Sequence, residues 1–428
     1  MRSTKTMGLV SVSMALAVTL TACSSDSDKE ASPKPTSPFR TQPYTAPDAN
    51  TGIGPTDQAL PTQIPEPIHV SELKPIGADQ VVIAEAGWGS LTTNLNVFDP
   101  KTGKLIQTVT SANTNWDLTP TVFAGEHPGL PYILGHEVWR PRGWRGKADY
   151  TLTWYEGDAT KPAEVVLPEE TRTHGRHSSN AVTPDGKYWV TWDDMLFGIR
   201  VVDLQAKKQT GKLQILNCGP FTWPVGHDIY SLCESSQELL QIHIDDNGVP
   251  SVANRTKVLP EGFTSARHAP FAADVKKALL VNGYGNAYLF DFANGLPTAP
   301  VEKAGSVVKA GISFDNPAVN ADASRISVPY TDGEIPAGSA RAGDWKKTIV
   351  FDAAFKEVGE LTADDLGGGS AESQVFSTDG KILYVLASKD DKTTLYGFDA
   401  ASLKQVSKAP VKGPGPLGEM FAPLTVTP

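Results

Sequence analysis

The stretch SSNAVTPDGKYWVTWDDMLFGIRVVDLQAKKQTGKLQI, which spans Ser178–Ile215, contains short apolar runs with turn signals between them. Its Thr183–Gly186 segment, TPDG, is typical of a tight turn, because proline presets φ and glycine accepts a positive φ. Tyr188–Trp192 is aromatic and β-branched, as strands prefer, and Ile199–Asp203 predicts a second strand. Leu213–Ile215 opens a third. With a strand ahead of the first turn, the stretch predicts one four-stranded antiparallel sheet.

The end of the Ile199–Asp203 strand recurs through the chain as an apolar pair followed by an acidic residue. The acidic positions are Asp99, Glu156, Asp203, Asp245, Asp291, Asp352 and Asp399. Successive gaps are 57, 47, 42, 46, 61 and 47 residues, close to the repeat of about 40–50 residues of a propeller blade. An array of β-sandwiches would show short strands but not this comb of spacings. The sequence therefore predicts an all-β fold, a seven-bladed β-propeller of four-stranded antiparallel blades.

The composition favours a large, turn-rich domain. The 428 residues are 40% hydrophobic and include 38 Gly and 33 Pro, which suits a large core and an all-β fold. The net charge is −10, and it becomes −12 once a leader containing Arg2 and Lys5 is removed. Such a surface repels nucleic acid, and no cluster of Lys and Arg offsets it. We therefore expect no nucleic-acid partner.

The N-terminus predicts export and a lipid anchor. Residues 1–22 have a basic start and then the apolar run Met7–Leu20, as in a secretory signal peptide. The segment Leu20–Cys23, LTAC, resembles the bacterial lipobox, in which the cysteine is lipidated and becomes the mature N-terminus. An ordinary signal peptide with a nearby cysteine is the alternative. We expect a lipoprotein of the bacterial envelope, held outward-facing at the cell membrane through Cys23.

The remaining chain divides into a tether and a folded domain. Residues 23–67 are rich in Ser, Thr, Pro and Asp and contain almost no apolar run. Such a segment cannot bury enough surface to fold alone, so it predicts a disordered, lipidated tether. The propeller then covers residues 68–428. Because a closing propeller must hide two sheet edges, we expect the C-terminal run Leu424–Val426 to join the first blade.

Two cysteines remain after Cys23. Cys218 and Cys233 are fifteen residues apart. In an exported protein the simplest outcome is a disulfide, which would stabilise the fold by roughly 3 kcal/mol on the chain-entropy model. Two free thiols or half of a metal site are the alternatives, although the spacing suits neither CxxC chemistry nor a zinc knuckle.

About a third of the chain carries motifs that resemble a known family. The motifs are Val182–Lys187, Val201–Leu204, the pair Cys218 and Cys233, Arg267–Pro270 and Gly413–Pro416. They are similar to those of the heavy, β-propeller chain of the quinoprotein amine dehydrogenases, such as methylamine dehydrogenase, and the cysteine spacing is like that of the family's disulfide. In that family a small cysteine-rich subunit carries the tryptophan-derived quinone, and the heavy chain supplies scaffold and part of the substrate channel. The resemblance implies a large subunit that needs such a partner.

No catalytic motif stands out. The chain has no nucleophile elbow, HExxH, P-loop or strand–helix GxGxxG. Asp245–Gly248 resembles a calcium loop in composition only, because it lacks the glutamate of the twelfth position, and it predicts a hairpin turn. We therefore expect no catalytic residue and no cofactor on this chain, except for zinc, for which candidate ligands exist.

Alignment of the blades indicates these ligands. His177 and His268 directly precede the innermost strands of the third and fifth blades, and Asn316 and Glu372 hold similar positions in the sixth and seventh. Residues at this phase line one mouth of the central channel. His177, His268 and Glu372 are candidate metal ligands, and Asn316 is a candidate ligand contact. The alternative is that each histidine caps its own turn and never meets the others.

A second candidate site is the segment His136–Arg145, the densest mix of Trp and Arg in the chain. Trp139, Arg140 and Trp144 are candidate partner or ligand contacts, because Trp and Arg dominate interface hot spots. A packed surface loop with Arg stacked on Trp is the alternative.

Three functions follow, in order of preference. The first is a lipid-anchored, non-catalytic binding or scaffold protein with a protein partner at the cell envelope. The second is the large subunit of an amine-dehydrogenase-like oxidoreductase. The third is an envelope zinc-binding or chaperone propeller, although the chain has only eight His and no His-rich N-terminal segment.

Overall fold

The computed structural model describes most of the chain after residue 71. The described residues are 72–77, 79–87, 92–112, 123–124, 133–140, 145–155, 157–158, 163–168, 170–172, 177–264, 269–282, 284–309, 312–314, 317–332, 345–390, 392–411 and 418–421. The chain divides into one unit of residues 1–68 and another of residues 69–428. The predicted signal peptide, Cys23 and the tether lie outside the described residues. Within those residues, no helix has the length and apolar character of a bilayer span.

Five sheets have four strands each. In each sheet, every strand hydrogen bonds to the next one named, from one edge of the sheet to the other. The first is β31 (Gly418–Phe421), β2 (Val81–Gly87), β3 (Thr92–Phe98) and β4 (Leu105–Ala112). The second is β5 (Phe123–Ala124), β6 (Ile133–Trp139), β7 (Asp149–Tyr155) and β9 (Ala163–Leu167). The third is β10 (Asn180–Val182), β11 (Tyr188–Asp193), β12 (Gly198–Asp203) and β13 (Lys208–Gln214). The fourth is β14 (Trp223–Val225), β15 (Asp228–Cys233), β16 (Glu238–Ile244) and β17 (Pro250–Lys257). The fifth is β18 (Phe271–Ala272), β19 (Lys277–Val281), β20 (Asn286–Asp291) and β21 (Gly305–Ser306).

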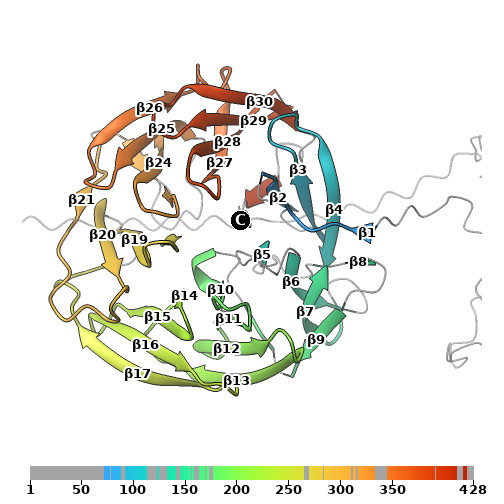
Figure 1. Ribbon diagram of the computed structural model, residues 1–428, viewed down its shortest axis with the longest axis vertical. Helices are drawn as coiled ribbons and strands as arrows, with labels where there is room; N and C mark the ends of the chain where they lie inside the picture. Colours follow the sequence, from blue (N-terminus) through green and yellow to red (C-terminus); the bar gives the residue numbers. More distant parts are fainter. Residues whose placement is uncertain are drawn as a thin grey trace, which may run out of the picture. The chain divides into compact units, whose positions relative to one another are not determined.

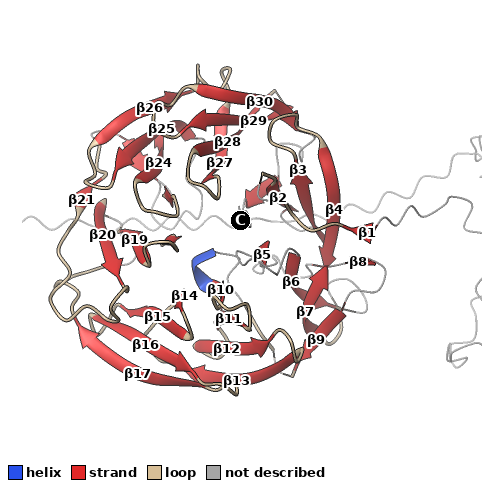
Figure 2. Cartoon of the chain, in the orientation of Figure 1, coloured by secondary structure: helices blue, strands red, loops and turns tan. Residues whose placement is uncertain are grey.

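The remaining strands form two further sheets. A nine-stranded sheet contains β22 (Ile312–Phe314), β23 (Ala318–Val319), β24 (Arg325–Asp332), β25 (Trp345–Asp352), β26 (Glu357–Thr362), β27 (Ser370–Phe376), β28 (Ile382–Lys389), β29 (Lys392–Asp399) and β30 (Gln405–Val411). The pair β1 (Glu72–Leu73) and β8 (Gly157–Asp158) completes the strands. One 3₁₀ turn, η1 (His177–Ser179), is the only helical element among the described residues (Figure 2).

Within residues 69–428 the sheets stand around a central axis (Figure 1). The strands β2, β10, β14, β19 and β27 lie toward the axis, and β4, β13, β17, β26 and β30 run along the outer rim. Neighbouring sheets pack face to face; Val190 and Ile199 of the third sheet share one buried cluster with Ile229 and Ile242 of the fourth. The predicted all-β, β-propeller fold is confirmed.

Strand β11 shows why these segments form strands. All six residues from Tyr188 to Asp193 are buried, because neighbouring sheets cover both faces, so the strand is mostly apolar on both faces and its two polar residues, Thr191 and Asp193, are buried as well. Ahead of it, the Gly186 N–H donates to the Thr183 carbonyl at 2.7 Å, and Gly186 has φ of +71°. The TPDG turn is therefore formed as the sequence predicts.

The recurring acidic residue closes a turn at the end of each third strand. The following side chains each accept a hydrogen bond from a backbone N–H two or three residues further on: Asp99, Asp203, Asp245, Asp291, Asp352 and Asp399. This Asx turn leads into the outer strand. Glu156 lies outside the described residues. The regularly spaced acidic residues of the sequence thus mark equivalent turns in successive sheets.

The number of separate blades differs from the prediction. The sequence predicts seven four-stranded sheets, whereas the described residues form five, and the strands from β22 to β30 make one sheet. A single residue pair, Trp345 with Ala371, joins β25 to β27. On β25 the pairing with β26 begins only at Lys347. The backbone of Trp345 is therefore left at an open edge of β25, and the start of β27 pairs with it there.

A C-terminal strand closes the first sheet, although a different segment forms it. Gly418–Phe421, β31, pairs antiparallel with β2. The sequence instead assigns this role to Leu424–Val426, which lies outside the described residues. The physical requirement, an edge that must be paired, is the same for both segments.

Candidate binding face

Successive turns of an up-and-down antiparallel sheet lie at opposite ends of the strands. One end of each sheet carries the connection between the second and third strands, together with the segment that enters the next sheet. We call this end the mouth face and the other the base face. Trp139 ends β6 at the mouth face and Arg140 follows it. His177 begins η1 just ahead of β10, and Glu372 lies in the first half of β27.

The described residues do not test whether the predicted channel-mouth set comes together. Glu372 is half-buried, and of His177 only the backbone is described. His268 and Asn316 lie outside the described residues, as does Trp144 of the Trp–Arg segment. The described part of the chain contains no group of three His, Cys, Asp or Glu side chains that could hold a metal ion. The zinc site therefore stays a prediction.

Trp139 is a half-exposed aromatic side chain whose indole is hydrogen bonded to a buried residue. Its exposed fraction is 49%. The indole Nε1–H donates to Oε2 of Glu137 at 3.3 Å. Residues two apart on a strand point to the same face of the sheet, so Glu137 lies one step deeper along β6 on the side of Trp139.

Glu137 is a carboxylate inside the fold, with an exposed fraction of 1%. The Thr153 hydroxyl donates to its Oε2 at 2.6 Å, and the Tyr155 hydroxyl donates a short hydrogen bond to its Oε1. Both donors come from β7, the strand paired with β6. A buried carboxylate needs such donors, because burial without them is costly. The β7 hydroxyls thereby fix the acceptor that holds the Trp139 indole.

Arg140 contacts the backbone of its own loop. Its Nη1–H donates to the Gly146 carbonyl at 2.9 Å. This bond closes the connection from β6 to β7 next to Trp139. Arg140 therefore stabilises the loop. Of the two candidate contacts Trp139 and Arg140, Trp139 is the more exposed to solvent.

The other face of β6 carries a second buried polar layer. His136 is buried and stacks on Trp189, with ring centroids 6.3 Å apart. Burial, and then the positive charge of Arg200, lowers the pKa of His136 to about 3, so its ring is neutral near pH 7. Arg200 donates from Nε to Oδ2 of Asp193 at 2.5 Å, and both side chains are buried. This ion pair fixes β11 to β12 below the mouth face.

Sequence reasoning does not identify Glu137, Thr153, Asp193 or Arg200. A signal is present, since Glu137 and Arg200 are charged residues in the interior of largely apolar strands, and buried charge requires a partner. The identity of each partner depends on which strands pair and in which register. That information is absent from the pattern of a single strand.

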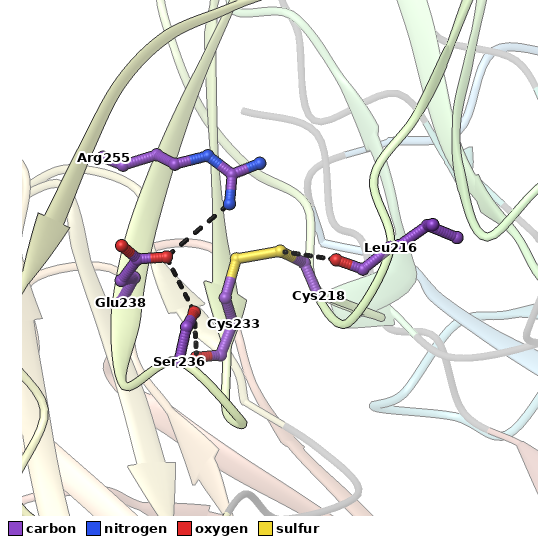
Figure 3. The surroundings of a disulfide bond; sticks show 6 residues. All are labelled: Leu216, Cys218, Cys233, Ser236, Glu238 and Arg255. Atoms are coloured by element: carbon purple, nitrogen blue, oxygen red, sulfur yellow. Dashed lines mark hydrogen bonds and ion pairs between the residues drawn. A yellow bond between two sulfur atoms is a disulfide. The ribbon is translucent and has the colours of Figure 1, made fainter.

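The predicted disulfide between Cys218 and Cys233 is confirmed (Figure 3). It ties the segment between β13 and β14 to the end of β15, at the mouth face. Cys233 is fully buried. Beside it, Glu238 accepts from the Ser236 hydroxyl at 2.7 Å and pairs with Arg255 at 3.6 Å.

The bridged segment packs directly on the third sheet. A Cβ added at Gly219 would come within 2.3 Å of the Trp192 ring. Only glycine allows so close an approach. The disulfide therefore holds a segment that contacts two sheets at once.

Large apolar side chains reach solvent at the mouth face. The turn from β11 to β12 exposes Met195 and Phe197, the segment after β13 exposes Leu216, and the turn from β19 to β20 exposes Tyr284. The Ile215 N–H donates to the Phe197 carbonyl at 2.7 Å, which places Phe197 beside Leu216. Exposed apolar groups of this kind mark interaction surfaces when they gather.

Comparison with known proteins gives the fold and no family. No protein-family model matches the chain, and no curated protein matches it. A proposed 6-phosphogluconolactonase from Bacteroides uniformis is similar with a TM-score of 0.51 and 13% identity, covering 80% of this chain and 100% of that one. A protein from Lactobacillus plantarum has a TM-score of 0.50 and 14% identity, covering 80% and 99%. The periplasmic gluconolactonase of Pseudomonas aeruginosa has a TM-score of 0.48 and 14% identity, covering 80% and 99%.

At such identities the likeness concerns the β-propeller alone. The shared β-propeller fold agrees with the fold that the resemblance to an amine dehydrogenase heavy chain implies. The closer relation to that family stays a prediction.

Proposed function

We propose that this protein is a lipid-anchored, non-catalytic binding propeller of the bacterial envelope that holds a partner protein on its mouth face. The observation that supports this most is the state of Trp139. It is half exposed, yet its indole is fixed by the buried Glu137. A rigid aromatic anchor loses little freedom on binding, so such residues suit interface hot spots.

Site-specific photo-crosslinking in intact membranes tests the proposal. A photo-crosslinking phenylalanine replaces Phe197, which is exposed on the mouth face, and in a control protein it replaces Val406 on the outer strand β30, which is also exposed. We expect one discrete crosslinked product from position 197 and none from 406. Adding Trp139→Ala should lower its yield about tenfold, the loss of one modest hot spot. Equal products from both positions, or a yield indifferent to Trp139→Ala, would contradict the proposal.

We further propose that the nine-stranded sheet represents two blades, which gives seven in all. Support comes from the pairing, since β24, β25 and β26 pair in order and β27 to β30 pair in order. In the strand pairing, one residue pair links the two groups. Each group also ends its third strand in a capping aspartate, Asp352 or Asp399.

The second candidate function is the large subunit of an amine-dehydrogenase-like enzyme. The disulfide between Cys218 and Cys233 favours it, because it joins the two cysteines that carry the resemblance. Purification of the native lipoprotein would then yield a small cysteine-rich subunit that stains for quinone, and the complex would reduce a dye in the presence of an amine. Purification without such a subunit removes this candidate.

Zinc binding is the remaining proposal. It assigns zinc to His177, His268 and Glu372, and a zinc titration tests it. If the double variant His177→Ala and His268→Ala binds zinc as the natural protein does, this assignment is wrong.

A further inference from the structure

Three buried serine hydroxyls have no hydrogen-bond partner among the protein atoms of the described residues. They belong to Ser178, Ser179 and Ser231. Ser179 and Ser231 have no exposed surface, and Ser178 is 6% exposed. Buried hydroxyls in native proteins nearly always have a partner, either protein or ordered water. A hydroxyl both donates and accepts, so these three groups leave several hydrogen bonds to be made.

The three serines lie in one region, where the innermost strands of the third and fourth sheets, β10 and β14, are close to each other. The Thr222 N–H donates to the Ser178 carbonyl at 2.6 Å, which joins the start of β10 to the start of β14. On the next strand, Trp223 pairs with Tyr230. One residue further along this antiparallel pair, Thr222 therefore lies alongside Ser231.

The side chain of Ser231 faces the third sheet. On β15 it lies between Ile229 and Cys233, each two residues away. Both of these belong to the buried cluster that the third and fourth sheets share, which also contains Trp192. Alternate residues of a strand point to one face, so Ser231 points into the same seam, toward the segment that carries Ser178 and Ser179.

The surroundings restrict what can satisfy these groups. An occupant must be small, because the side chains around it are closed to solvent. It must be neutral, because a buried charge without a charged partner is costly, and it must be able to donate and accept, because it meets hydroxyl groups. Water has these properties, and buried waters in proteins typically make about three hydrogen bonds to otherwise unsatisfied polar groups.

We propose that ordered water occupies the seam between the third and fourth sheets and hydrogen bonds to both Ser179 and Ser231. The water bridges the two sheets beneath the mouth face, deeper along β15 than Cys233 of the disulfide. This inference is independent of the proposed binding function.

A high-resolution crystal structure of the mature protein provides the first test. We expect water density within hydrogen-bond distance of Ser179 Oγ and Ser231 Oγ. An empty seam, a direct hydrogen bond between the two serines, or density for a larger molecule would each overturn the proposal.

Thermal unfolding of alanine variants provides the second test. Ser179→Ala and Ser231→Ala each remove one partner of the water, so each should lower Tm by about 1–3 °C. The double variant should lose less than the sum, because both serines hold the same water. Ser251→Ala, at an exposed position of β17, is the control and should leave Tm unchanged. If the seam is dry, the alanine variants remove unsatisfied groups and Tm rises, which would also overturn the proposal.

Discussion

Asp185 is the residue whose ionisation links two sheets at the base face. His227 Nε2 lies 2.6 Å from Asp185 Oδ2 across the seam between the third and fourth sheets. Partial burial opposes ionisation, but the Thr183 hydroxyl and the His227 ring outweigh it, and the pKa of Asp185 falls to about 2. This value lies below the ordinary 3.8. The stabilisation is therefore complete above about pH 4 and is lost as the pH falls through 2.

Replacement of Asp185 tests this linkage. The side chain is 43% exposed, so solvent screening limits the pair to about 0.5–1 kcal/mol. We expect Asp185→Asn to lower the free energy of unfolding near pH 7 and to flatten its decline between pH 4 and pH 2, measured by urea denaturation. Asp379→Asn is the comparison for the turn alone, because Asp379 closes the equivalent turn in β27–β28 and its pKa is lowered mainly by the Ser377 hydroxyl. An unchanged pH profile in Asp185→Asn would contradict the assignment.

At the scale of elements, the disulfide fixes the segment between β13 and β14. It closes a loop with a sequence separation of 15 residues, for which the chain-entropy model gives about 3 kcal/mol. That segment also packs through Gly219 on Trp192 of the third sheet. Loss of the bridge should therefore loosen the contact between two sheets as well as the loop itself.

We expect the double variant Cys218→Ser and Cys233→Ser to unfold at a lower temperature, with a loss of about 2–4 kcal/mol. Circular dichroism with thermal denaturation measures it. Reductant should lower the Tm of the natural protein toward that of the variant and leave the variant unaffected. If reductant leaves the natural protein unaltered although free thiols form, the bridge contributes nothing to stability.

At the scale of the whole molecule, β31 supplies the strand that the first sheet lacks. It pairs with β2 through Ala84, Glu85, Ala86 and Gly87. Without it, β2 presents an open edge, and the chain end no longer closes the ring of sheets seen in Figure 1. Open edges also promote pairing between molecules.

Deletion of residues 418–428 should therefore destabilise the entire propeller. We expect a lower Tm and rapid proteolysis near β2, together with soluble aggregates on size exclusion. Deletion of residues 422–428 alone is the control, because it keeps β31. If the longer deletion unfolds like the shorter one, closure by β31 does not support the ring.

The sequence alone was sufficient to predict the features that repeat along the chain and those that depend only on a few neighbouring residues. The TPDG turn and the capping aspartates are local, because proline, glycine and an Asx side chain act on their own few residues. Their spacing is enough to predict a β-propeller. The cysteine pair was predictable as well, because the N-terminus predicts export and two remaining cysteines then have one simple pairing.

Only the tertiary structure decided what depends on contacts between distant strands. It placed the Glu137 carboxylate beneath Trp139 and set the hydroxyls of Thr153 and Tyr155 against it. It also merged β25 with β27 through one residue pair. The physical reason is that register and edge pairing bring together side chains that are far apart in the sequence. A strand's own pattern fixes which of its residues are buried but not which groups they meet.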